Sequence, residues 1–361
     1  MKILTIIGAR PQFVKAGAVS RAVREHSQLT EYIVHTGQHY DENMSDIFFR
    51  ELDLPPPHLN LNIGSGPHGQ QTGRMLEALE HIMLDVAPDR VLVYGDTNST
   101  LAGALAAVKL HIPVAHVEAG LRSFNRHMPE EINRIATDHV SSRLYTPTAT
   151  ATANLLREGV PATSLLEIGD VMYDAYRHYV RHAPSPSAKL GLERGGYILA
   201  TVHRAENTDD PTRFSAIWHA LLKLSHTMPV VFPIHPRTRQ AAGKLGLLDA
   251  ARDHAGMFLL EPVGYLEMIG WQSGARLIVT DSGGMQKEAY FSEIPCATLR
   301  DETEWTELVT AGWNTLVPPD SAEAIEQRLL ALLDGARPAG GEHFYGDGTA
   351  AMKVVHDLLA S

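Results

Sequence analysis

Short apolar runs alternate with amphipathic segments along most of the chain. The runs show little polar alternation, which is typical of strands buried on both faces of a parallel sheet. They lie at 2–8, 31–37, 90–96, 113–119, 143–148, 197–204, 229–235, 257–263, 275–281, 295–300 and 314–319. Helical patterns separate many of them, at 11–26, 69–86, 97–111, 130–142 and 211–227. This alternation predicts an α/β fold built from two doubly wound, Rossmann-like domains.

A change of composition separates two series of strands. Segment 173–196 contains two prolines, Pro184 and Pro186, and ends in a glycine pair. Because such a composition suits a linker, we predict an N-terminal domain at 1–170 and a C-terminal domain at 171–348. A final helical pattern at 349–361 could pack on either domain, the N-terminal one included.

Composition and charge restrict the function classes. The 361 residues are 44% hydrophobic and carry a net charge of −11, so no general nucleic-acid footprint is expected. The one cysteine, Cys296, cannot form an internal disulfide and suits a reducing compartment. No apolar run is long enough for a membrane span, and the N-terminus does not resemble a signal peptide. We therefore expect a soluble, cytoplasmic protein. No histidine pair has the spacing of a zinc motif, so no metal is expected.

Polar residues follow six of the predicted strands at their carboxyl ends, where ligands of open α/β sheets bind. Two such sheets would create a ligand cleft between the domains. These ends are 8–11, 95–96, 118–120, 203–204, 235 and 281–284.

The stretch TDSGGMQKEA, at 280–289, indicates an anion site. Gly283 and Gly284 let a ligand approach the backbone closely, and the free N–H groups of a helix N-terminus suit a diphosphate. Ser282 could equally be a simple helix N-cap. Glu288, one turn into the helix, could accept hydrogen bonds from a ribose diol or favour the helix dipole.

Arg10 and Lys15 flank the first predicted helix. They are either solvated residues of a helix start or cations that face the same anion from the other domain.

Acidic residues provide candidates for proton transfer. Glu118 ends a buried strand before two small residues, which is hard to explain structurally. Asp96 could instead be an N-cap. Glu130 and Glu131 follow Pro129 as in ordinary helix starts, and Glu130 could pair with Arg134 at i+4.

Two histidines, His203 and His235, end strands of the second domain and could face one cleft. The segment GSGPHG, at 64–69, matches a dinucleotide fingerprint only superficially. The residues before it are polar and rich in proline, so a nicotinamide cofactor is not expected.

The chain resembles the non-hydrolysing UDP-N-acetylglucosamine 2-epimerases, which share the two-domain fold of B-type glycosyltransferases. The resemblance runs nearly end to end. It is carried by segments 8–15, 35–44, 95–103, 116–123, 129–134, 203–207, 235–239, 264–268, 280–289, 299–304 and 345–348.

The resemblance implies roles for these residues. Ser282, Gly283 and Gly284 would bind the diphosphate. Further substrate contacts would come from Arg10, Lys15, His235, Pro262, Tyr265, Glu288, Arg300 and Glu304, with Glu288 on the ribose and the segment around Pro262 and Tyr265 on the uracil. The catalytic positions would be Asp96, Glu118, Glu130 and His203.

The family reaction explains this choice of residues. Carbon 2 of the sugar has no adjacent carbonyl to acidify its proton, so UDP is understood to leave first, giving a 2-acetamidoglucal, and then to add back. The step requires stabilisation of departing UDP and acid and base groups near carbon 2, without a cofactor. The resemblance implies a homodimer that converts UDP-N-acetylglucosamine to UDP-N-acetylmannosamine for cell-surface polysaccharide precursors.

Some positions depart from the common family pattern. Gln12 replaces a common glutamate and Trp305 a common arginine, as in a subset that acts on UDP-2,3-diacetamido-2,3-dideoxy-glucuronate. That uronate is the alternative substrate. A glycosyltransferase and a non-catalytic UDP-sugar-binding protein are alternatives of other classes. Gln38 matches part of an activating UDP-sugar site in bacterial members, but the region near 66–74 matches poorly.

Overall fold

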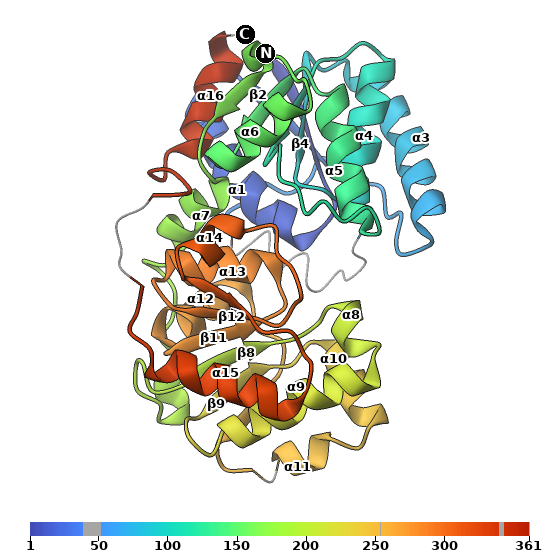
Figure 1. The fold of residues 1–361 in the computed structure, drawn as a ribbon. Coiled ribbons are helices and arrows are strands. Elements are labelled where there is room, and N and C mark those ends of the chain that lie inside the picture. Colours follow the sequence, from blue (N-terminus) through green and yellow to red (C-terminus); the bar gives the residue numbers. More distant parts are fainter. Residues whose placement is uncertain (39–51, 253, 339–342, 361) are drawn as a thin grey trace. The chain divides into compact units, whose positions relative to one another are not determined.

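The computed structural model describes residues 1–38, 52–252, 254–338 and 343–360. The described chain divides into two compact units. Unit 1 comprises Met1–Arg177 and His343–Ser361, and unit 2 comprises His178–Glu342. Both units alternate strands with helices, as the apolar runs predicted (Figure 1).

The described strands of unit 1 form one parallel sheet in the order β3-β2-β1-β4-β5-β6-β7. The strand bounds are β1 (Lys2–Ile7), β2 (Thr30–His35), β3 (Leu59–Asn60), β4 (Arg90–Tyr94), β5 (Val114–Val117), β6 (Arg143–Thr146) and β7 (Leu165–Glu167). The helix bounds are α1 (Arg10–Arg24), α3 (His68–Val86), α4 (Asn98–Lys109), α5 (Pro129–Val140), α6 (Ala149–Arg157), α7 (Val171–Tyr179) and α16 (Ala350–Ala360). Because the strand order reverses between β1 and β4, α1 and α3–α5 cover opposite faces of the sheet (Figure 1).

The C-terminal helix α16 packs on unit 1. It contacts α1, and Asp357 accepts hydrogen bonds from Arg143 and from the Tyr145 hydroxyl, the latter at 2.8 Å. At its other end, the Asp174 carboxylate accepts from the Ala351 backbone N–H at 2.7 Å. The two ends of this helix are therefore fixed by β6 and α7.

The described strands of unit 2 form a second parallel sheet, in the order β10-β9-β8-β11-β12-β13. The strand bounds are β8 (Ile198–Thr201), β9 (Val230–Pro233), β10 (Met257–Leu260), β11 (Leu277–Thr280), β12 (Cys296–Thr298) and β13 (Asn314–Leu316). The helix bounds are α8 (Ala205–Thr208), α9 (Pro211–Leu224), α10 (Pro236–Lys244), α11 (Leu248–Arg252), α12 (Tyr265–Gly274), α13 (Gly283–Phe291), α14 (Thr306–Thr310) and α15 (Ala322–Asp334).

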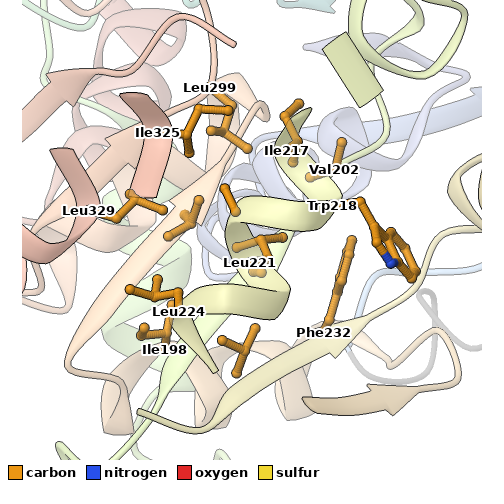
Figure 2. Packing of buried hydrophobic residues seen from close by; sticks show 14 of the residues in the cluster. Ile198, Val202, Ile217, Trp218, Leu221, Leu224, Phe232, Leu299, Ile325 and Leu329 are labelled. Atoms are coloured by element: carbon orange, nitrogen blue, oxygen red, sulfur yellow. The ribbon is translucent and has the colours of Figure 1, made fainter. Parts of the chain in front are cut away.

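One face of the second sheet carries a large apolar core. Leu221 of α9, Leu329 of α15 and Val279 of β11 belong to it, and all three are fully buried (Figure 2). Trp218 and Phe232 extend it, with ring centroids 5.9 Å apart. This packing explains the uninterrupted apolar character of the strands.

The segment predicted as a linker, 173–196, contains the division between Arg177 and His178 of the two units, and part of it is ordered by packing. It contains the end of α7 and a 3₁₀ helix, Pro186–Leu190. Gly270 of α12 lies against it so closely that a Cβ there would meet the Pro184 carbonyl oxygen at 2.1 Å. Proline and serine can signal a turn that packs as well as a flexible connection.

Each sheet reverses its strand order once, between β1 and β4 in unit 1 and between β8 and β11 in unit 2. Ligands of open α/β sheets bind outside the carboxyl ends of strands at such points. The predicted site residues are therefore expected at these two edges, one in each unit.

Candidate active site

Glu118 has a strained backbone at the carboxyl end of β5. Its φ angle is +73°, a left-handed conformation that non-glycine residues seldom adopt. The backbone N–H groups of Glu118 and Ala119 both donate to the Tyr145 carbonyl, at 3.1 and 3.0 Å, which holds the turn in place. Such strain persists only where the surroundings enforce it, and it is concentrated at functional sites.

The strained turn directs the Glu118 carboxylate toward Lys15 of α1. Lys15 Nζ forms an ion pair with Glu118 Oε2, and both side chains are only 8% exposed. Gly95 lies beneath this pair, with φ at +63°, and a Cβ there would approach both Glu118 Oε2 and Lys15 Nζ to 3.2 Å. Glycine at 95 therefore lets the buried pair lie directly over the end of β4.

Asp96 follows Gly95 and contacts Arg134 of α5, with 2.5 Å between Oδ2 and Nη2. Arg134, for which an i+4 pair with Glu130 was predicted, also contacts Glu131 at 2.5 Å. Glu130 is exposed, whereas Glu131 is 1% exposed.

Glu131 fixes the loop before α5. Its carboxylate accepts from the backbone N–H groups of Ser123 and Phe124, both at 3.0 Å. The acids behind Pro129 indicated this position, but the sequence did not decide between the two neighbouring glutamates. The predicted catalytic set contained Glu130 and left out Glu131 and Arg134, which contact each other beside Asp96.

Gln12 is buried in unit 1, and both its amide oxygen and its amide nitrogen form hydrogen bonds there. Its amide oxygen accepts from Gly8 and Ala9, at 2.8 and 3.0 Å, and its nitrogen donates to the Tyr94 carbonyl and the Thr100 hydroxyl, both at 2.9 Å. Since the side chain is 1% exposed, it shapes the turn after β1.

Arg10 and Gln38 lie near the same edge. Arg10 is the first residue of α1 and is half-buried. The Gln38 amide oxygen accepts from the backbone N–H and hydroxyl of Ser99 in the first turn of α4, at 3.0 and 2.7 Å. This ties Gln38 to the helix that follows Asp96. Residues 39–44 of the same family segment lie outside the described residues.

In unit 2, the glycine turn begins α13 as predicted. Ser282 is the N-cap, and its hydroxyl accepts from the Met285 backbone N–H at 3.5 Å. Gly283 has no positive φ angle, so backbone freedom does not explain it. A Cβ at this position would meet Glu304 Oε1 at 2.6 Å. The glycine instead leaves room for the close approach of a carboxylate.

Arg300 holds that carboxylate in place. Its Nη1 donates to Glu304 Oε2 at 2.9 Å, and the two side chains are 2% and 9% exposed. Arg300 Nε also lies 3.6 Å from the Glu206 carboxylate. Both predicted substrate-binding residues, Arg300 and Glu304, therefore lie beside the α13 N-terminus.

His203 and His235 end neighbouring strands, and their ring centroids lie 5.6 Å apart. Asp281, which is fully buried, accepts from the His203 backbone N–H at 3.1 and 3.0 Å and lies 3.4 Å from His203 Nδ1. His235 Nδ1 accepts from the Arg237 backbone N–H at 3.2 Å and caps α10. Asp281 is thus a positioning group that the predicted site omitted, although it ends the run before the glycine turn.

Glu288, Tyr265 and Pro262 differ in exposure. Glu288 is 6% exposed, and its Oε2 accepts from Gln272 of α12 at 2.7 Å. Tyr265 is 8% exposed, with its ring 6.0 Å from that of Tyr179 in an edge-on arrangement. Pro262 is exposed. All three belong to the elements around β10, α12 and α13.

Trp305 covers a buried cation. Lys287 Nζ lies 4.3 Å above the Trp305 ring, and the two residues are 1% and 3% exposed. Such a cation–π contact stabilises a desolvated ammonium. Trp305, which stands where the family resemblance places a common arginine, thus packs against Lys287 of α13, a contact that the sequence alone did not reveal.

The described part of the chain contains no helix long and apolar enough to cross a membrane. No group of three or more His, Cys, Asp or Glu side chains suited to a metal ion occurs among the described residues.

A family model described as UDP-N-acetylglucosamine 2-epimerase matches residues 21–359. The chain belongs to the UDP-N-acetylglucosamine 2-epimerase family. Among its relatives, a UDP-2,3-diacetamido-2,3-dideoxy-D-glucuronate 2-epimerase of Pseudomonas aeruginosa is 52% identical, with 99% of both chains covered. A UDP-N-acetylglucosamine 2-epimerase homolog of Methanococcus maripaludis is 50% identical, again with 99% of both chains covered.

Solved structures agree with this family assignment. A crystal structure of Methanocaldococcus jannaschii UDP-GlcNAc 2-epimerase, in complex with UDP-GlcNAc and UDP, has a TM-score of 0.92 and 43% identity, with 100% of both chains covered. These comparisons confirm the predicted family of this UDP-N-acetylglucosamine 2-epimerase family member. They also confirm the α/β class with two Rossmann-like domains and the isomerase class.

Proposed function

We propose that the protein interconverts UDP-N-acetylglucosamine and UDP-N-acetylmannosamine by eliminating UDP and adding it back through a 2-acetamidoglucal. The observation that carries this proposal is the strained Glu118, which is paired with buried Lys15 beside the Asp96–Arg134 pair. A carboxylate in such a setting can be tuned for proton transfer. A buried structural ion pair would not require the backbone strain.

We assign the nucleotide to unit 2. The N-terminus of α13, with Ser282, Gly283 and Gly284, would hold the diphosphate through backbone N–H groups and the helix dipole. Glu288 would bind the ribose, and the segment from Pro262 to Tyr265 the uracil. Arg300, Glu304 and His235 would complete the contacts. The complex of the Methanocaldococcus jannaschii relative with UDP-GlcNAc and UDP supports a UDP-sugar as ligand.

We assign proton transfer at the sugar to Asp96, Glu118 and Glu130, and to His203 at the unit 2 edge. Arg10 and Lys15 would supply positive charge for departing UDP. The proposal is better supported for Glu118 and Asp96, because each follows a strand and is paired with a cation on a neighbouring helix. Glu130 is exposed and its part in the reaction rests on the family pattern alone.

A second candidate substrate is UDP-2,3-diacetamido-2,3-dideoxy-glucuronate, which is favoured by the 52% identity to the Pseudomonas aeruginosa enzyme named for it. We do not choose between the two substrates on Gln12 or Trp305, because both residues are at least 97% buried. A uronate carboxylate would need another cation. Arg204 is available, since its Nη2 lies 3.7 Å from the Cβ position of Gly283.

Proton NMR in deuterated water tests the proposal. The enzyme is incubated in parallel with UDP-N-acetylglucosamine and with the diacetamido uronate. We expect the epimer with deuterium at carbon 2, because the abstracted proton exchanges with solvent. Epimerisation with full retention of hydrogen would contradict the mechanism. A preference for the uronate above about tenfold in kcat/KM, roughly 1.4 kcal/mol in transition-state binding, would make the uronate the proposed substrate and UDP-N-acetylglucosamine the second candidate.

The same experiment separates the other classes. A glycosyltransferase would consume the donor only when an acceptor is added, and a binding protein would retain UDP-sugar without turnover. A homodimer, a cytoplasmic location and a role in polysaccharide precursor synthesis remain predictions from the family resemblance. Light scattering of the purified chain tests the first of these.

A further inference from the structure

His116 contacts a hydrogen-bond acceptor at both ring nitrogens. It lies on β5, two residues before Glu118, and is 0% exposed. Its Nδ1 lies 2.7 Å from Asp138 Oδ1 of α5, and its Nε2 lies 2.7 Å from the Gly95 carbonyl oxygen. The acceptors belong to different elements on either side of the ring, so one side chain connects α5 to the end of β4.

A neutral imidazole cannot satisfy both contacts. It carries one N–H donor, so the other nitrogen would place its lone pair against an oxygen at 2.7 Å. A proton on Asp138 Oδ1 could donate to Nδ1 of a neutral ring, but this arrangement is disfavoured, because Arg122 donates to Asp138 Oδ2 at 2.7 Å and the Gly120 N–H donates to the same oxygen at 3.1 Å. Both contacts favour the ionised carboxylate.

The charges around this ring balance. Arg122, 4% exposed, also forms a double hydrogen bond with Glu158, at 2.7 and 2.8 Å. Two carboxylates, Asp138 and Glu158, thus face one guanidinium and His116. Burial alone would raise the pKa of Asp138, but the hydrogen bond and charge of His116, together with Arg122, hold it below its usual value. A buried cluster of this kind is stable when each charge is paired and hydrogen-bonded.

The Gly95 peptide lies between this cluster and the candidate acid–base pair. Its carbonyl contacts His116, and the space where a Cβ would point is covered by Glu118 Oε2 and Lys15 Nζ, each at 3.2 Å. Asp96 is the next residue. Any rotation of the Gly95 peptide would therefore move Asp96 and disturb the packing of the Glu118 and Lys15 side chains over Gly95.

We propose that His116 carries both ring protons and acts as a positioning residue, which fixes the Gly95–Asp96 peptide against the Lys15–Glu118 pair. The kinetic consequence rests on the proposed epimerase function, whereas the protonation state does not. Charged groups face the site from each neighbouring element: Asp138 on α5, Lys15 on α1, and Arg122 and Glu118 in the turn after β5.

Nitrogen NMR of the full chain labelled at histidine tests the protonation state without any substrate. At pH 7.5, we expect both His116 nitrogens at the protonated position, with the assignment made by loss of the signals in His116→Gln. His35 is the internal control. It is 2% exposed, one of its nitrogens contacts Asn60, and burial lowers its pKa, so it should show one bare nitrogen. A bare nitrogen at His116 would overturn the proposal, whether or not the protein is an epimerase.

The kinetic test compares His116→Gln with His139→Gln. Both remove a histidine of the same cluster, but His139 is exposed and its side chain contacts Glu158 at 3.1 Å, with no hydrogen bond or ion pair to His116, Asp138 or Gly95 among the described residues. We expect His116→Gln to lower kcat by about 10- to 100-fold at nearly unchanged KM, the scale for a small misplacement of reacting groups. His139→Gln should retain kcat. Full kcat per folded molecule in His116→Gln would overturn the positioning role.

Asp138→Asn is the second variant, for the case that His116→Gln does not fold. It keeps the shape of the side chain but removes the charge opposite His116. We expect one His116 nitrogen to lose its proton in the NMR spectrum and kcat to fall, while KM changes little. Retention of both protons, or of full kcat with a bare nitrogen, would contradict the proposal.

Discussion

The ammonium group of Lys15 is paired with the carboxylate of Glu118, 103 residues further along the chain, and both side chains are only 8% exposed. Glu118 makes this contact from a left-handed backbone conformation, with φ at +73°. The pair joins the second turn of α1 to the end of β5. The carboxylate that we propose as an acid–base group is thereby held in one orientation by a cation that is itself buried.

Replacing Lys15 with methionine should leave the Glu118 carboxylate buried without its ammonium partner. Breaking one side of a buried pair costs about 3–5 kcal/mol, so a clear fall in the free energy of unfolding is expected, together with a loss of kcat. Arg24→Met is the matched control, because the Arg24–Asp53 pair is exposed and should contribute about 0–1 kcal/mol. Equal unfolding midpoints in urea for the two variants would contradict the buried pairing.

Glu118→Gln and Asp96→Asn should each lower kcat by about 100-fold or more, the usual scale for general acid–base groups. Asp96→Asn should nearly keep the melting temperature, because its side chain is 29% exposed. Glu131→Gln is the comparison, since it weakens the hydrogen bonds that the Glu131 carboxylate accepts from the Ser123 and Phe124 N–H groups. This change should lower the melting temperature. Unfolding of Asp96→Asn at unchanged specific activity would show that Asp96 is structural.

Gly283→Ala should weaken binding of UDP. The added methyl would meet Glu304 Oε1 at 2.6 Å, so the Glu304 carboxylate, and with it Arg300, must move. We expect calorimetry to show a higher Kd for UDP with little loss of stability. Gly73→Ala in α3 has open space around the new methyl and should instead stabilise the helix by about 0.5–1 kcal/mol. Unchanged UDP affinity in Gly283→Ala would argue against a diphosphate site at α13.

Asp174→Asn should stabilise the protein near neutral pH. Burial raises the pKa of Asp174 to about 6, above its usual value of 3.8. The folded state therefore binds the proton more tightly, and stability is lost as pH rises from about 4 to about 6. The neutral amide avoids this loss and can still accept from the Ala351 N–H.

Melting temperatures at pH 4 and pH 7.5 measure the effect of Asp174→Asn. The gain should be present at pH 7.5 and small at pH 4. Asp85→Asn, an exposed change on α3, controls for the loss of one negative charge. A gain for Asp174→Asn that is equal at both pH values would contradict a raised pKa.

Much of the fold could be predicted because the apolar runs carry local information. A strand covered by helices on both faces must be apolar throughout, so β1, β4 and β11 were visible as uninterrupted runs. The glycine turn before α13 was visible for the same kind of reason, since it is a local strand-to-helix connection. The order within segment 173–196 could not be predicted, because proline and serine do not reveal whether a turn packs against another helix.

The sequence by itself determined which residues end the strands: Asp96, Glu118, His203 and Ser282 follow apolar runs, and a strand end in a parallel sheet opens toward the ligand edge. Only the tertiary structure decided their partners. Sheet order and register bring Lys15 to Glu118 and Arg134 to Asp96, and place the His116 ring between Asp138 and Gly95. These contacts join residues between 21 and 103 positions apart. No local pattern encodes them, because the pairing depends on how separately folded strands and helices pack together.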